Sequence, residues 1–307
     1  MSGARLFRQE HPFLTGCLLL ALVMLIFWGG VTLLIASFGG PAKKELFSRR
    51  DGVGVIEIKG VITTADEIIA DLTAFREEAS IKAVLLRIDS PGGAVGASQE
   101  LYEEVKRTNA IKPVVASLGS VAASGGLYAA LGAGKIVANP GTITGSMGVI
   151  VKFANLEELF AKIGYRSEVI KSGALKDVGS AERPMTEEER LMLQELIDGV
   201  HSQFITAVAA SRNLPEETVR GLADGRIFSG AQALDHQLVD ALGNLNDAAL
   251  LAAGLAGLDT AKAPNLIYPA KKDFSLLSLF MGEQARAALT RPLLMLPTLA
   301  YEWTMSP

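Results

Sequence analysis

In the middle of the chain, strand-like and helix-like patterns of apolar residues alternate. Residues 53–62 alternate apolar and polar side chains, as a strand does, and residues 82–89 form a nearly continuous apolar run, typical of a strand buried on both faces. Each run is followed by apolar residues at helical spacing, in 64–80 and in 97–110. Strands that alternate with helices predict an α/β domain with a mostly parallel sheet and flanking helices.

Further elements are expected along the same domain. A helix is predicted at 156–164, between two strand-like stretches. The strands predicted after the first two are 112–120, 135–140, 147–153 and 165–173.

A long helix is predicted from near Thr186 to about Arg212. The Thr186 hydroxyl can accept a hydrogen bond from the first turn, while the Glu189 side chain, three residues on, can reach back. Two or three shorter helices are expected to complete the domain by about residue 255.

The N-terminal region is apolar in a different way. No residue from Pro12 to Ala42 carries a charge, and 13–38 is long enough for a helix that crosses a bilayer of roughly 30 Å. The apolar part of a cleaved signal peptide is usually only about 7–15 residues long, so we expect an uncleaved anchor. The lysines and arginines around the segment do not settle its orientation, because long domains are translocated largely regardless of charge.

The predicted organisation has five parts. Prolines interrupt the apolar residues of the last part, which could pack on a neighbour, lie on the membrane or be mobile. The parts are an N-terminal segment at 1–12, a transmembrane helix at 13–38, a linker at 39–52, the α/β domain at 53–255 and a C-terminal tail at 256–307.

Composition narrows the choice of partners. Hydrophobic residues make up 49% of the chain, a share that supports a lipid-embedded segment. The net charge of -4 and the absence of basic runs interleaved with aromatics argue against nucleic acid as a partner. The single cysteine, Cys17, lies inside the apolar segment, so the sequence predicts no disulfide, no metal cluster and no cofactor.

Two glycine-rich stretches follow predicted strands, where open α/β sheets place their ligands. In "DSPGGAV" (89–95), the glycines allow a tight turn that exposes backbone N–H groups suited to an oxyanion, although a purely structural turn would look the same. In "VAASGGLYAA" (121–130), Ser124 lies where a strand would end and a helix begin. Its hydroxyl could be a nucleophile beside the N–H of Gly125, or Ser124 could simply be a small residue in a close contact.

A serine nucleophile needs a base, and the residue types offer two choices. His11 precedes the predicted membrane span, His201 falls midway along the predicted long helix, and His236 has no obvious glycine turn beside it. Each is expected to be a surface or core histidine. Lysine can act as a base because burial disfavours its charged form. Lys171 and Lys176 flank a glycine in "VIKSGALKDVGS", and their positions alone do not choose between them.

Five stretches taken in order resemble one known family. They are "DSPGGAV", "GSVAASGGLYAA", "TGSMGV", "SGALKDVGS" with "ERPMT" after it, and "DGRIFSGAQAL". Together they resemble the signal peptide peptidase A family, serine peptidases of the Clp protease and crotonase superfamily, over about residues 53–245. The resemblance implies a Clp protease/crotonase-like fold and a serine peptidase activity.

The resemblance also implies a role for five residues. Ser124 would be the nucleophile, and Lys176, not its neighbour in the loop, would be the general base. Ser146 would hydrogen-bond the lysine. The backbone N–H groups of Gly93 and Gly125 would form the oxyanion hole.

Family resemblance further implies a setting for the reaction. It implies a single-pass protein of a bacterial-type inner membrane, with the protease domain on the outer face and the substrates being remnants of signal peptides. Short members form a homo-oligomeric ring, in which neighbouring subunits contribute the serine and the lysine. One departure lies away from these residues: Gln237 stands where members often have glycine.

Three other interpretations remain open at this point. A related membrane protease associated with stomatin-like proteins also uses serine and lysine, but it usually has several more spans. A crotonase-type acyl-CoA enzyme would share the fold without needing Ser124. A non-catalytic scaffold tethered to the membrane would need neither Ser124 nor Lys176.

Overall fold

The computed structural model describes residues 20–30, 51–269 and 300–302. The chain divides into two compact units, Met1–Arg50 and Asp51–Pro307. In the first unit, residues 20–30 are helical, and the rest of the predicted span at 13–38 lies outside the described residues, as do the segments predicted at 1–12 and, up to residue 50, at 39–52. Within the described ranges, no helix combines the length and the apolar character that crossing a membrane requires.

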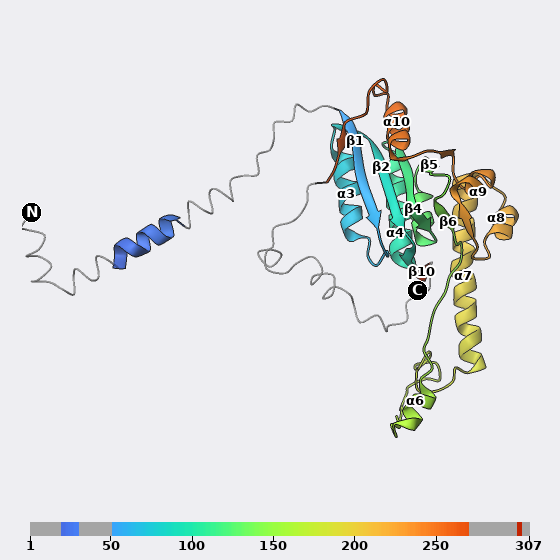
Figure 1. Cartoon of the computed structure of the whole chain (residues 1–307). Coiled ribbons are helices and arrows are strands. Elements are labelled where there is room, and N and C mark those ends of the chain that lie inside the picture. The colour runs from blue at the N-terminus through green and yellow to red at the C-terminus, as the bar shows by residue number, and fades with distance from the viewer. Residues whose placement is uncertain (1–19, 31–50, 270–299, 303–307) are drawn as a thin grey trace, which may run out of the picture. The chain divides into compact units, whose positions relative to one another are not determined.

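The second unit is an α/β domain built on a mostly parallel sheet, as predicted (Figure 1). Its centre is formed by β1 (Gly52–Lys59), β2 (Ile81–Ser90) and β4 (Val114–Ala123), which pair in parallel in the order β1–β2–β4. Parallel strands need crossover connections, and α3 (Asp66–Glu77) and α4 (Val95–Asn109) provide them. The two predicted strands and the two helices that follow them are therefore confirmed.

Strand β4 changes partners along its length, so its carboxyl end lies between β2 and β6 rather than beside β5. Its first half pairs in parallel with β5 (Lys135–Ala138), and its last three residues pair with β6 (Ile143–Gly145). Between the two halves the register with β2 shifts, and the Val121 N–H there donates to the Asp89 carboxylate at 3.0 Å. The sheet is completed by β7 (Ile227–Ser229), β8 (Ala241–Leu242) and β9 (Leu266–Ile267).

Apolar side chains cover both faces of the sheet. One core combines alternate residues of β1, β2 and β4 with α3, α4, the short α5 (Gly125–Ala130) and part of the long helix. The other core packs the opposite face against four alanines of α10 (Leu245–Leu255). Burial on both faces explains why the strand at 82–89 reads as a continuous apolar run.

The long helix is α7 (Glu187–Arg212), and its start confirms the predicted cap. The Glu189 N–H donates to the Thr186 hydroxyl at 3.2 Å, and the Thr186 N–H donates to the Glu189 carboxylate at 2.8 Å. The shorter helices that follow it are α8 (Glu216–Leu222), α9 (Gly230–Asp235) and α10.

Gln237, the residue in place of a family glycine, adopts the left-handed conformation that glycine favours, with φ at 59°. Two hydrogen bonds close a Schellman turn at the end of α9: Gln237 N–H to the Leu234 carbonyl, and Leu238 N–H to the Ala233 carbonyl. The turn is therefore kept, with backbone strain at a residue that carries a Cβ.

Two predicted strands, 147–153 and 165–173, do not form, so these predictions are wrong. Both lie in residues 147–190, which we call the arm. The arm also contains α6 (Glu157–Lys162) and the start of α7, and Figure 1 shows α6 at the end of α7 that points away from the sheet. A strand needs a neighbour for its backbone hydrogen bonds, and no strand of the described residues pairs with these segments.

The other small element is a two-stranded antiparallel sheet. Strand β3 (Gly92–Ala94) follows directly after β2, and its partner β10 (Ala300–Glu302) comes from the C-terminal segment. The register places Tyr301 opposite Gly93. The rest of the predicted tail between residues 270 and 299 lies outside the described residues.

Candidate active site

Ser124 lies at the junction between β4 and α5, as the sequence predicts. The Ser124 N–H donates to the Gly145 carbonyl at 2.8 Å, and the Ser124 carbonyl accepts from the Tyr128 N–H at 2.9 Å. These bonds fix the backbone on both sides of the turn, so the position of the side chain is set by the sheet and the helix together.

The backbone of Ser124 is strained and its hydroxyl is unsatisfied. Its φ is 54° and its ψ is -118°, a region that residues with a Cβ rarely adopt. The residue is 1% exposed, and Oγ has no hydrogen-bond partner among the described residues. Because a buried hydroxyl normally finds a partner, this arrangement points to function rather than to packing alone.

Gly93 and Gly125 lie side by side next to this serine. A Cβ built on Gly125 would be 3.2 Å from the Gly93 nitrogen and 2.4 Å from the Ser98 Oγ. A Cβ built on Gly93 would be 2.0 Å from the Ile62 carbonyl oxygen. Both positions therefore require glycine, and their backbone amides come from two neighbouring turns.

Ser146 lies directly after the adjacent strand, β6. It follows Gly145, whose carbonyl holds the Ser124 N–H, and the Ser146 N–H donates to the Arg226 carbonyl at 2.7 Å. Ser146 is buried and has a positive φ of 51°. The structure thus brings together four of the five predicted site residues: Ser124, Ser146, Gly93 and Gly125.

Lys176, the fifth, lies on the arm. It is exposed, and its backbone N–H donates to the Gly173 carbonyl at 3.2 Å in a series of turns. Since Ser124 Oγ has no partner within the described residues, the chain does not bring its own Lys176 into hydrogen-bond contact with the serine.

The histidines lie elsewhere. His201 is on α7, and the His236 ring packs against Phe228 with ring centres 5.0 Å apart. His11 lies outside the described residues. Neither described histidine hydrogen-bonds the Ser124 hydroxyl.

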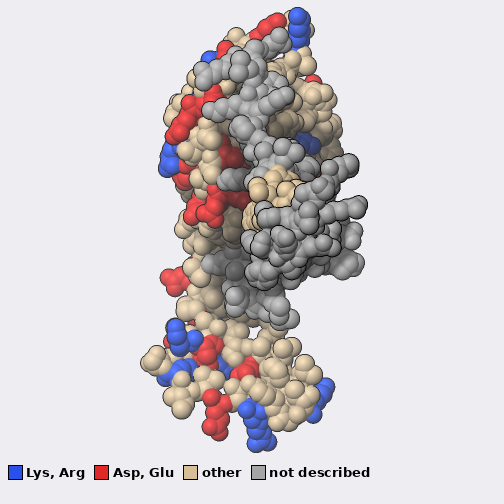
Figure 2. Space-filling view, turned by 90° about the vertical axis from the view of Figure 1, so that its left-hand side faces the viewer, with Lys and Arg blue, Asp and Glu red and all other residues tan. Residues whose placement is uncertain are grey.

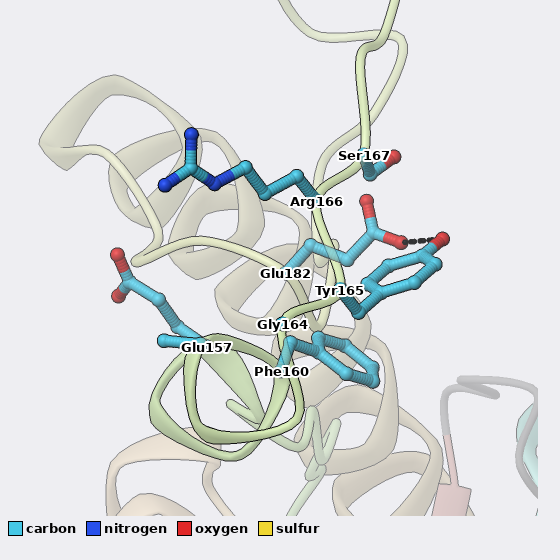
Figure 3. Close-up of a pocket in the computed structure, with 8 residues that line it drawn as sticks. Glu157, Phe160, Gly164, Tyr165, Arg166, Ser167 and Glu182 are labelled. Carbon is cyan, nitrogen blue, oxygen red and sulfur yellow. Dashed lines mark hydrogen bonds between the residues drawn. The ribbon is translucent and has the colours of Figure 1, made fainter.

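A cavity of about 400 Å³ lies on the arm rather than beside Ser124 (Figure 3). It is formed around α6, and the Tyr165 hydroxyl and the Glu182 carboxylate are hydrogen-bonded at its wall, 3.2 Å apart. Its lining includes none of the predicted site residues.

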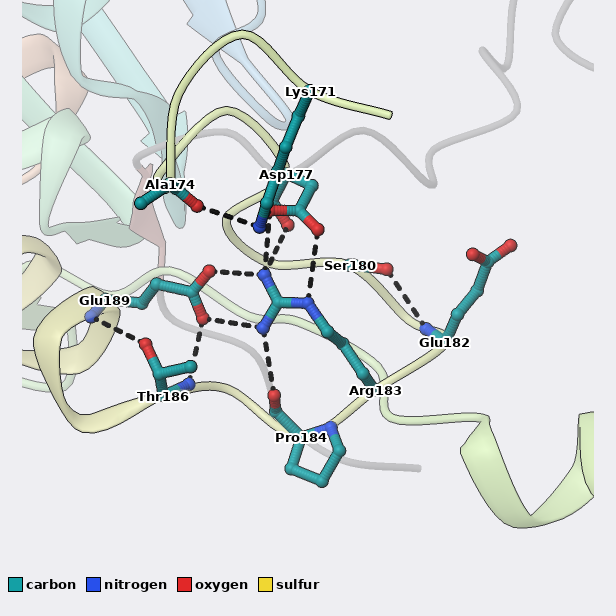
Figure 4. A network of polar contacts seen from close by, with 9 residues as sticks. All are labelled: Lys171, Ala174, Asp177, Ser180, Glu182, Arg183, Pro184, Thr186 and Glu189. Atoms are coloured by element: carbon teal, nitrogen blue, oxygen red, sulfur yellow. Dashed lines mark hydrogen bonds and ion pairs between the residues drawn. The ribbon is translucent and has the colours of Figure 1, made fainter. Parts of the chain in front are cut away.

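The residues around Lys176 form a polar network that the sequence patterns did not predict (Figure 4). Asp177, next to Lys176, accepts from the Lys171 ammonium at 2.5 Å and from the Arg183 guanidinium at 3.2 Å. Arg183 also forms two hydrogen bonds with Glu189. An acidic, a basic and an acidic residue at six-residue intervals are the only signal, and two of them, Asp177 and Arg183, lie outside helices and strands, where no periodic pattern indicates which side chains pair.

The charges of this network lower the pKa values of its two carboxyl groups, Asp177 and Glu189. Hydrogen bonds from Arg183, then from Lys171, hold the pKa of Asp177 far below its usual value. Hydrogen bonds from Arg183 and then from the Thr186 backbone lower the pKa of Glu189 to about 2. Both carboxylates are therefore charged at neutral pH.

Comparison with protein-family models identifies the family. The model of peptidase family S49 matches residues 106–259, and the Clp protease model matches residues 31–143. The chain belongs to peptidase family S49. As a member of this family it is a serine peptidase, and the motif resemblance seen in the sequence is confirmed.

Individual relatives agree with the S49 assignment. The protein slr0021 of Synechocystis sp., named as a protease, is 49% identical over 217 residues, which is 70% of this chain and 78% of that protein. Serine protease SPPA, chloroplastic, of Arabidopsis thaliana is 34% identical over 76% of this chain and 36% of its own length. A protein of Enterococcus faecium named as a signal peptide peptidase is 38% identical over 59% of this chain and 53% of its own length. This S49 chain thus matches about a third to a half of the last two.

Proposed function

We propose that this chain is a membrane-anchored endopeptidase that uses Ser124 and Lys176 to cleave extended apolar peptides, including remnants of signal peptides. The observation that carries the proposal is the Ser124 hydroxyl, which is buried, unpaired among the described residues, and held on strained backbone beside two required glycines. A nucleophile next to two backbone N–H donors is the arrangement that acyl transfer needs.

The base comes, in this proposal, from a second copy of the chain. Ser124 lacks a partner among the described residues of its own chain, while Lys176 is exposed on the arm. A ring of like subunits would place the arm of one copy against the carboxyl end of β4, and hence Ser124, in the next. Ser146, at the end of the neighbouring strand, would then accept or donate a hydrogen bond at the incoming amine.

The reaction follows from these positions. The neutral Lys176 amine takes the proton from the Ser124 hydroxyl, and Oγ attacks the scissile carbonyl carbon. The new oxyanion accepts hydrogen bonds from the N–H groups of Gly93 and Gly125. When the C–N bond breaks, the Lys176 ammonium gives its proton to the leaving amine.

The second half of the reaction releases the acyl group. A water molecule gives a proton to Lys176 as its oxygen attacks the ester carbon. The ester bond to Oγ then breaks, and the Lys176 ammonium returns a proton to Ser124. Serine and lysine are thereby regenerated in their starting states.

Strand β10 suggests how a peptide binds. It lies antiparallel on β3, with Tyr301 opposite Gly93, so the edge of β3 accepts an extended backbone next to the proposed oxyanion hole. A substrate bound in the same way would gain main-chain hydrogen bonds without regard to sequence, and its scissile carbonyl would lie beside Gly93 and Gly125. Substrates with small or apolar residues near the cut follow from the family resemblance.

The membrane setting rests on the uncharged stretch from Pro12 to Ala42. We propose that residues 13–38 anchor the protein in a bacterial-type inner membrane and that the peptidase domain lies on its outer face. Such a location would bring the site close to signal peptides that have been released into the bilayer.

A serine-reactive probe, applied to the full chain in detergent across a range of pH, tests the proposal. Labelling of the native protein should increase with pH as the base becomes neutral, and Ser124→Ala should abolish it. Lys176→Ala should slow labelling by about 100-fold or more, the usual contribution of a general base.

Two lysines of the arm serve as comparisons. Lys162→Ala, at the exposed end of α6, should label like the native protein. Lys171→Ala should slow labelling far less than Lys176→Ala does. If Lys171→Ala proves as damaging as Lys176→Ala, or if Ser124→Ala still labels, the assignment of the dyad is wrong.

A further inference from the structure

Lys176 sits in a series of turns with little packing of its own. In residues 151–190, Glu189 is the only buried residue, and an apolar contact close to Lys176 is the half-buried Phe153 ring against Gly179. The turns are closed by weak backbone contacts, such as Lys176 N–H to the Gly173 carbonyl at 3.2 Å and Val178 N–H to the Leu175 carbonyl at 3.3 Å. A base that must reach a hydroxyl needs a firmer support than this.

Arg183 supplies such a support, because it holds the residue next to Lys176 at two points. The guanidinium pairs with the Asp177 carboxylate at 2.9 Å, and the same group donates to the Asp177 backbone carbonyl at 3.3 Å. The Asp177 carbonyl also accepts from the Ser180 N–H at 3.1 Å. The turn is therefore fixed at both its side chain and its main chain.

The other side of Arg183 is tied to the long helix. Arg183 Nη1 donates to the Glu189 carboxylate at 2.9 Å, and Nη2 donates to the other oxygen of the same group. Glu189 is 1% exposed and belongs to the capping box with Thr186. Since α7 reaches the core of the domain through Phe204 and Val208, this path connects the turn of Lys176 to the rigid body.

We propose that Arg183 is a positioning residue for the base: by bridging Asp177 and Glu189 it holds the turn that carries Lys176 against the start of α7. This inference rests on the proposed function of Lys176. Arg183 does not touch the substrate in this account and acts only through its neighbour.

The bridge also sets the charge around the base. The charged side chains that pair with one another in the network are Lys171, Asp177, Arg183 and Glu189 (Figure 4). Glu182, also drawn there, joins the network through its backbone N–H, which donates to the Ser180 hydroxyl. With Arg183 removed, the Asp177 carboxylate keeps only Lys171 as its partner, and its negative charge then favours the protonated form of the adjacent amine. Activity that depends on the neutral amine should therefore appear at higher pH.

The test compares variants of the full chain by peptide hydrolysis over pH. Arg183→Met should lower kcat by about 10- to 100-fold with KM within about twofold, the cost expected for a misplaced catalytic group, and should move the acid limb of the pH profile upward. Arg183→Lys, a point charge that cannot bridge both carboxylates in the same way, should restore the acid limb and only part of kcat.

Arg190→Met is the matched control. Arg190 pairs with Glu187 near the start of the same helix, at 2.9 Å, and both side chains are exposed. Losing this arginine should change neither kcat nor the acid limb. If Arg183→Met fails to fold or assemble, judged by circular dichroism and light scattering, Glu189→Gln replaces it. Glutamine keeps the capping box, loses the charge that holds Arg183, and should lower kcat in the same way by a smaller factor.

The outcomes separate this inference from the proposed function. If Lys176→Ala is inactive but Arg183→Met, or Glu189→Gln in its place, matches the native kcat and acid limb, Arg183 does not position the base, and the dyad stands. If kcat falls but the acid limb stays and Arg183→Lys gives no rescue, the effect is structural and the inference also fails. If Lys176→Ala is as active as the native chain, the proposed dyad itself is wrong.

Discussion

The body of the domain and the arm place their chemical groups in opposite ways. Around Ser124 every support is backbone or core: a sheet, a helix and two glycines whose Cβ atoms would collide with their neighbours. Around Lys176 the supports are charged side chains at the surface. The proposed nucleophile is therefore built into the fold, whereas the proposed base is carried on a projecting segment that, in our proposal, meets the Ser124 of a second copy.

The surface of the arm fits this division. On the face that Figure 2 shows, basic and acidic side chains are intermixed at the arm end of the molecule. Apolar side chains are exposed on the arm as well, with Val169 at 54% and Ile170 at 101%. Exposed apolar residues at this density commonly mark a surface that another protein covers.

The largest expected effect on activity is at Ser124, in the body of the domain. Both Ser124→Ala and Ser124→Gly should lower kcat by more than about 10⁴-fold, since the nucleophile is lost. The free energy of unfolding of Ser124→Gly should exceed that of Ser124→Ala by about 1 kcal/mol, because glycine adopts the positive φ without strain and alanine does not. Thermal melts of the two variants beside the native chain check this difference. If Ser124→Gly is no more stable than Ser124→Ala, the backbone at residue 124 is not strained as we infer.

A smaller loss is expected at Gly93. Its Cβ in Gly93→Ala would lie 2.0 Å from the Ile62 carbonyl oxygen, so β3 must shift and its N–H leaves the oxyanion position. Turnover should fall about 100-fold or more. Gly96→Ala is the control, because nothing lies within 4 Å of the new Cβ in α4, and its kcat should not change. Native kcat in Gly93→Ala would remove Gly93 from the site.

A gain of several-fold is expected from the C-terminal segment. Deleting residues 300–307 removes β10 and leaves the edge of β3 open to substrate. If β10 covers this edge in most molecules of the native protein, only the remaining fraction can bind substrate, so kcat/KM should rise in inverse proportion to that fraction. Deleting residues 303–307 retains β10 and serves as the control. Equal kcat/KM values for the two truncations would mean that β10 does not compete with substrate.

The smallest effect is expected far from the site, at Gln237. Gln237→Gly relieves a φ of 59° at the end of α9, so the free energy of unfolding should rise by less than about 1 kcal/mol. Peptidase activity should stay the same. Denaturant titration measures the change, and a destabilised variant would show that contacts of the glutamine side chain outweigh the strain.

The difference between body and arm also explains what the sequence could predict. Strands 53–62 and 82–89 were predictable because their apolar residues face a core, whereas 147–153 and 165–173 look strand-like in sequence but pair with no strand of the described residues. Ser124 was located from the glycines after it, but its positive φ depends on the Gly145 carbonyl of another strand. The Arg183 bridge was missed because pairing of loop residues with one another and with the start of a helix follows no period.

The central claim is that one active site draws Ser124 and Lys176 from neighbouring copies. Ser124→Ala and Lys176→Ala chains, each inactive alone, can be co-expressed with different tags and purified on both, and peptide hydrolysis by the mixed particles then measured. Sites that pair an intact Ser124 with an intact Lys176 should restore about a quarter of native activity at equal mixing. If the mixed particles assemble but stay as inactive as the single variants, the two residues do not meet across subunits and the account is wrong.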